Sequence, residues 1–113
     1  MVAQSTAIIL ANEYLQAVRA AGVTIRSAYL FGSHALNKQH EWSDIDVALV
    51  SDDFTGLAAL DKDRFRRLHI QPKFLAIEVH TFPTKRWKEG DPFVKEILKT
   101  GIELKPIHAA VGI

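Results

Sequence analysis

The chain contains no cysteine, which excludes disulfides, zinc–thiolate sites and thiol catalysis. Its net charge is only +1, whereas proteins that bind nucleic acid strongly usually have a clear basic excess. Its apolar runs are far shorter than the roughly 20 residues of a membrane-spanning helix, and residues 1–4 lack the basic, apolar start of a signal peptide. We therefore expect a cytoplasmic enzyme or binding module that is not bound to a membrane and binds no nucleic acid strongly.

The chain of 113 residues has no internal repeat, linker or low-complexity segment, so we expect a single domain over residues 1–113. Hydrophobic spacing and breaker residues predict three helices and three strands. The first helix is expected to begin at Thr6, with Ser5 as its cap, and to stop at Gly22; the other two helices are expected over 56–70 and 93–100. The strands are expected over 23–31, 45–50 and 73–82, and a short extended segment is expected at 102–107. This order predicts an α+β (mixed α/β) fold, with a small mixed sheet and helices packed on one side.

Two short motifs carry the candidate chemistry. A strand ends in Gly32-Ser33, a tight turn whose backbone N–H groups can hold a phosphate. Asp44 follows Ser33 by eleven residues, and Asp44 and Asp46 point from one face of the next strand because strand side chains alternate. Two carboxylates beside a phosphate-binding turn are suited to holding Mg²⁺ against a nucleoside triphosphate.

Two further residues allow more than one interpretation. Glu78 lies on the third strand, opposite its aliphatic stripe, and stands beside Asp44 and Asp46 if the second and third strands pair; the alternative is a solvated edge residue. His34 follows Ser33 and could contact phosphate, although a solvated loop histidine is the simpler interpretation. The five histidines show no metal-binding spacing such as His-x₃-His.

The residues Leu30-Phe31-Gly32-Ser33-x-Ala35, followed by Ser43-Asp44-Ile45-Asp46-Val47, resemble the minimal nucleotidyltransferase (MNT) domains of the DNA polymerase beta superfamily. The resemblance covers essentially the whole chain. It implies that Asp44 and Asp46 bind two divalent metals and that Gly32-Ser33 binds the nucleotide phosphates. It further implies that Glu78 is the third acid, which activates the attacking hydroxyl and completes one metal site.

The motif departs from the family pattern at two points. Family members often have Gly-Ser-Arg-Ala-Arg-Gly, whereas this chain has His34 and Leu36 at the two arginine positions. Neutralisation of the triphosphate would then depend on the metals and Lys38. The third acid is a glutamate in place of the common aspartate. Since all three acids are present, we expect an active domain.

The resemblance implies hydroxyl attack on the α-phosphorus of a nucleoside triphosphate such as ATP, with two Mg²⁺ ions and loss of pyrophosphate. The chain ends at Ile113, soon after the last predicted helix, so we expect a separate chain to supply the acceptor or its binding surface. The leading hypothesis is adenylylation of a small helical HEPN-type partner, as in two-gene toxin–antitoxin modules. One alternative is transfer to a small molecule, with a separate helical subunit that binds it. Another is a non-catalytic antitoxin that binds nucleotide or neutralises its partner by contact. The protein could also form a homo-oligomer.

Overall fold

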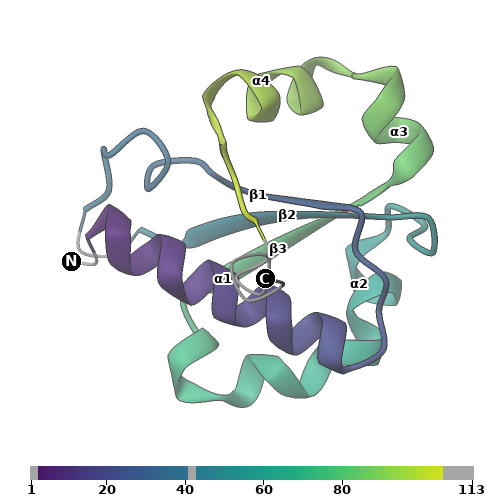
Figure 1. The fold of residues 1–113 in the computed structure, drawn as a ribbon, viewed down its shortest axis with the longest axis horizontal. Coiled ribbons are helices and arrows are strands. Elements are labelled where there is room, and N and C mark those ends of the chain that lie inside the picture. The colour runs from purple at the N-terminus through teal and green to yellow at the C-terminus, as the bar shows by residue number, and fades with distance from the viewer. Residues whose placement is uncertain (1–2, 41–42, 106–113) are drawn as a thin grey trace, which may run out of the picture.

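The first helix, α1 (Gln4–Ala20), lies across one face of a four-stranded sheet in the computed structural model (Figure 1), which describes residues 3–40 and 43–105. Its buried side chains, Ala7, Ala11, Tyr14, Leu15 and Val18, follow the predicted helical spacing. The helix ends before Gly22, whose φ of +93° favours glycine, as predicted. The predicted cap at Ser5 is wrong: the N-cap is Ala3, without a capping side chain.

The sheet has the order β3-β2-β1-β4 and is mixed. β1 (Ser27–Phe31) pairs antiparallel with β2 (Ile45–Ser51) and with β4 (Ile102–Glu103), whereas β2 and β3 (Ile77–Pro83) are parallel. The first strand is shorter than predicted because Ser27 pairs with Val50, close to where β2 ends. Of the predicted extended segment 102–107, residues 106 and 107 lie outside the described part.

The segment between β2 and β3 differs most from the prediction. In place of one helix over 56–70, a short α2 (Ala58–Asp61) leads into η1 (Lys62–Ile70), which is kinked at Phe65. The third strand starts at Ile77 and not at residue 73, because Pro72 opens the 3₁₀ turn η2 (Pro72–Phe74). That turn buries Phe74 in the same core as Ile77.

Helices cover both faces of the sheet, whereas the sequence predicted one helical layer (Figure 1). α1 and η1 lie on one side of the sheet. On the other side lie α3 (Thr84–Glu89), which was not predicted, and α4 (Pro92–Thr100), which was. α4 begins as predicted at Asp91-Pro92, and Asp91 accepts a hydrogen bond from the Val94 amide at 2.9 Å. That bond and the Arg86 guanidinium lower the pKa of Asp91. The α+β class and the mixed sheet are confirmed.

Candidate active site

Asp46 and Glu78 are neighbours across the parallel pair β2 and β3. The even-numbered residues of both strands face α4, because side chains alternate and Ile45, Val47, Ile77 and Val79 lie in the core beneath α1. Asp46 also pairs with Phe31, the last residue of β1, so both acids lie at the end of the sheet where the chain enters Gly32. The structure thus brings together the second and third of the three predicted acids.

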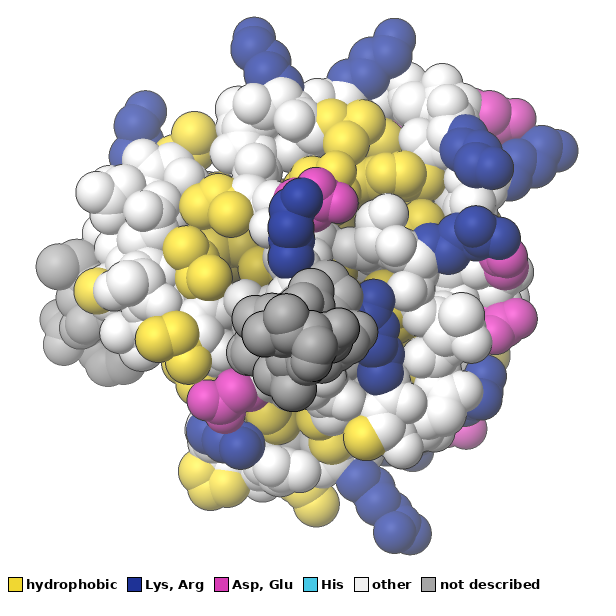
Figure 2. Space-filling model, in the orientation of Figure 1, with side chains coloured by type: hydrophobic (Ala, Val, Ile, Leu, Met, Phe, Trp, Pro, Cys, Tyr) yellow, Lys and Arg dark blue, Asp and Glu magenta, His cyan; other side chains and the backbone are white. Residues whose placement is uncertain are grey.

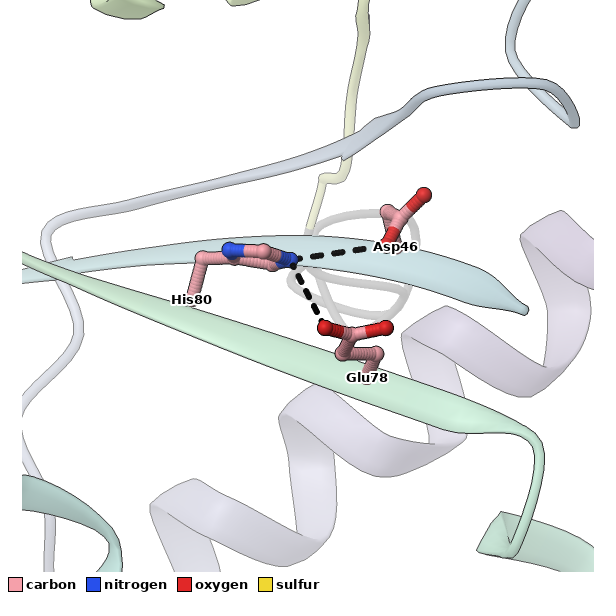
Figure 3. Close-up of side chains that lie close together, drawn as sticks. All are labelled: Asp46, Glu78 and His80. Carbon is pink, nitrogen blue, oxygen red and sulfur yellow. Dashed lines mark hydrogen bonds and ion pairs between the residues drawn. The ribbon is translucent and has the colours of Figure 1, made fainter. Parts of the chain in front are cut away.

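His80 joins this pair from β3, two residues after Glu78 (Figure 3). Its Nε2 is 3.4 Å from Asp46 Oδ1 and 3.8 Å from Glu78 Oε1. One ligand atom from each of the three side chains lies within 4.8 Å of the other two. His80 was not predicted, because the histidines show no helical metal-binding spacing; the signal available was the i, i+2 position after an acid on a strand.

The turn after β1 is shaped by Gly32, whose φ is +77°. A Cβ on Gly32 would collide with the Asp46 carboxylate, so the carboxylate packs directly on this backbone. The Gly32 carbonyl accepts from the Leu36 amide, and the Ser33 carbonyl accepts from the Lys38 amide at 2.8 Å. Ser33 is half-buried. The predicted phosphate-binding turn therefore contacts Asp46, one of the predicted acids.

His34 is buried, with 1% of its surface exposed, so its interpretation as a solvated loop residue is wrong. Its Nδ1 donates to the Asp44 carbonyl at 3.0 Å and ties the turn to the start of β2. Gln4 Nε2 donates to the carbonyls of His34 and Ala35, which fixes the turn to α1. The histidine is buried because α1 and β2 both bind the turn, and no local pattern reveals that.

Asp44 is exposed and precedes the first residue of β2. Among the described residues, the cluster of three potential ligands does not include it. The structure therefore places Asp44 next to the site through its backbone bond with His34, while its part in metal binding stays a prediction.

The donor set of the cluster fits a divalent cation. Asp46 and Glu78 supply oxygen ligands, and their side chains are 24% and 53% exposed, so both carboxylates reach water. Two adjacent carboxylates repel each other, and a bound cation relieves that repulsion. The contact between Gly32 and Asp46 leaves the backbone of the turn close to where such an ion would lie.

A cavity of about 280 Å³ adjoins the cluster along β3, with residues 78–82 forming one wall. Lys62, Arg86 and Phe93 lie on its other sides. Arg86 already has two interaction partners: its Nε donates a hydrogen bond to Asp91 at 2.6 Å, and its guanidinium lies over the Phe82 ring. The cavity is therefore lined by both charged and aromatic side chains, and it lies beside Glu78 and His80.

In the view of Figure 2, Lys and Arg side chains are spread over the face and around the rim, among acidic and apolar groups. Within the described residues, no helix is both long and apolar enough to cross a membrane.

The sequence profile of the family described as "Polymerase beta, Nucleotidyltransferase" matches residues 13–106, and the chain belongs to this family. The protein is thus a nucleotidyltransferase, with the architecture of a minimal domain of that class.

Solved structures of other proteins share its fold, the following three among them. A toxin–antitoxin with AMP-PNP is 19% identical, with a TM-score of 0.58, 88% of this chain and 76% of that chain covered. A mutant of the toxin–antitoxin MntA-HpeT, in which two aspartates are replaced by glutamate, is 17% identical, with a TM-score of 0.57 and the same coverage. A structure described as a nucleotidyltransferase from Sulfolobus solfataricus is 19% identical, with a TM-score of 0.58; the match covers 93% of this chain and 85% of that chain. No curated protein matches the chain.

Proposed function

We propose that this protein transfers AMP from ATP to a hydroxyl group of a partner protein, and that it acts as the antitoxin of a toxin–antitoxin pair. The observation that carries the proposal is the contact between the Gly32 turn and the Asp46 carboxylate, with Glu78 alongside on β3. Membership of the nucleotidyltransferase family supports the reaction type. One structurally similar protein is a toxin–antitoxin with AMP-PNP, which favours an adenine nucleotide and a protein partner.

Each residue has a defined part in this reaction. Gly32 allows the phosphates to approach the backbone, and Ser33 offers its N–H and hydroxyl to them. Asp44, Asp46 and Glu78 would hold two Mg²⁺ ions, which when bound supply charge neutralisation to the triphosphate and lower the pKa of the attacking hydroxyl. Asp44 would turn its exposed carboxylate towards the face that carries Asp46.

Glu78 takes the proton from the attacking hydroxyl in this scheme. The hydroxyl oxygen forms a bond to the α-phosphorus, the bond from that phosphorus to the bridging oxygen breaks, and pyrophosphate leaves. The cavity beside Glu78 supplies space for the acceptor next to the carboxylate that must accept its proton. The partner proposed from the family resemblance is a helical HEPN-type protein.

The test is to incubate the purified protein with Mg²⁺, labelled ATP and the product of its neighbouring gene, and to measure the intact mass of that product. We expect the mass to increase by one AMP unit and pyrophosphate to appear. Asp46→Asn should abolish transfer, while Asp53→Asn, a change of an exposed acid in the turn after β2, should leave it intact. Glu78→Gln should lower the rate far more than the nucleotide affinity.

The outcomes separate the alternatives. Metal-dependent pyrophosphate release without a modified partner would favour a small-molecule acceptor. Partner binding without any pyrophosphate would favour a non-catalytic antitoxin. Wild-type transfer by Asp46→Asn would contradict the proposed site.

A further inference from the structure

His80 Nε2 lies between two carboxylates: it forms a long hydrogen bond with Asp46 and a still longer ion-pair contact with Glu78 (Figure 3). Its distances of 3.4 Å to Asp46 Oδ1 and 3.8 Å to Glu78 Oε1 both exceed those of a well-formed N–H···O bond. A single N–H can be directed at only one oxygen. A cation at the centre of the three atoms would contact all of them.

The imidazole ring is held in this orientation by packing. Its centroid is 5.0 Å from that of Phe31 and 6.0 Å from that of Phe93, both edge-on. Across the sheet His80 is opposite Ala48, whose small side chain leaves room for the ring. A ligand that is fixed before the ion arrives loses little conformational freedom on binding.

We propose that His80 is a metal ligand and that the site it forms with Asp46 and Glu78 prefers a first-row transition dication to Mg²⁺. Mg²⁺ favours oxygen ligands in an octahedral arrangement, whereas an imidazole nitrogen raises the affinity for the later divalent ions. The inference rests on the proposed function in one respect, namely that these carboxylates hold a metal. It adds a nitrogen ligand, and a metal preference that three carboxylates alone would not produce.

Direct metal binding tests this without any measurement of transfer. Metal-free protein is titrated with Co²⁺ and with Mg²⁺ in the absence of nucleotide, and binding is followed by calorimetry and by the visible absorption of protein-bound Co²⁺. We expect wild-type protein to bind Co²⁺ more tightly than Mg²⁺. His80→Phe should keep the ring contacts with Phe31 and Phe93 while losing the nitrogen, and should lower Co²⁺ affinity by at least about tenfold with little change for Mg²⁺.

A second variant guards against a merely structural effect. His80→Asp replaces nitrogen by oxygen, so it should retain metal binding but lose the preference for Co²⁺ over Mg²⁺. Equal affinities of wild type and His80→Phe for Co²⁺, or no preference in the wild type, would overturn the inference and leave the proposed function standing. If Asp46→Asn also bound both ions normally, the metal centre itself, and with it the proposed function, would be wrong.

Discussion

Gly32 and Asp46 constrain each other at the scale of single residues. The turn needs a residue that accepts a φ of +77°, and the carboxylate needs a neighbour without a Cβ. Strand alternation and the Gly-Ser turn are visible in the sequence, so Gly32, Asp46 and Glu78 could be grouped in advance. The burial of His34 could not be foreseen, because it depends on α1 and β2. His80 follows Glu78 at i, i+2 on the same strand, but its contact with Asp46 depends on the pairing of β2 with β3.

Gly32→Ala should weaken metal-dependent ATP binding severely, because its methyl group would displace the Asp46 carboxylate. The matched control is Gly90→Ala, whose φ of +73° imposes similar backbone strain, while an added Cβ meets no atom closer than 3.7 Å. Each change should cost about 1–2 kcal/mol of stability from that strain. Calorimetric titration with ATP and Mg²⁺ distinguishes them: equal ATP affinity in the two variants would show that the contact between Gly32 and Asp46 is irrelevant to binding.

At the scale of elements, Asp61 joins α2 to the outer strand β3. Its Oδ1 accepts from the amide and hydroxyl of Thr55, and its Oδ2 accepts from the Gly56 amide and, at 2.7 Å, from the Thr81 hydroxyl. Burial opposes ionisation, but these hydrogen bonds outweigh it and lower the pKa of Asp61. The carboxylate thereby fixes one side of the cavity next to Glu78.

Asp61→Asn should destabilise the protein by about 1–3 kcal/mol at pH 7, because the amide NH₂ would face a buried donor. The folded-state pKa lies below the unfolded value of about 3.9, so the carboxylate's contribution is present above that value. It is lost as the pH falls through the folded-state pKa, and the difference between wild type and variant should shrink on acidification. Urea unfolding from pH 7 to pH 3 measures this.

The control is Asp63→Asn, since Asp63 forms an exposed ion pair with Arg66 and its replacement should affect stability little. An Asp61→Asn protein as stable as wild type at pH 7 would contradict a clamping role for Asp61.

The elements with regular patterns were predictable. Successive side chains of β2 enter the cores on opposite faces of the sheet, and α4 begins at Asp91-Pro92, so both elements agree closely with expectation. The region from 56 to 76 was not predictable. The hydrogen bonds of Asp61 and the burial of Phe74 hold it in short turns, in spite of its helical and strand spacing. Local propensity says little where tertiary bonds determine the backbone.

The whole molecule has its candidate site on the sheet face that α4 covers. The α+β class and the mixed sheet follow from the order of elements, but the second helical layer does not. It depends on α3, a six-residue helix without a buried residue, and on Val94 and Ile97 of α4, which pack with Phe82. That layer places Phe93 beside His80 and so forms part of the wall around the acids.

The central claim is that Asp46 and Glu78 hold the metal of a nucleotide bound at Gly32-Ser33. Anomalous diffraction from crystals of the protein with Mn²⁺ and a non-hydrolysable ATP analogue tests it most directly. We predict an anomalous peak within bonding distance of the Asp46 and Glu78 carboxylates, with the triphosphate against the Gly32-Ser33 backbone. Nucleotide and metal bound elsewhere, with both carboxylates free of contact, would contradict the account.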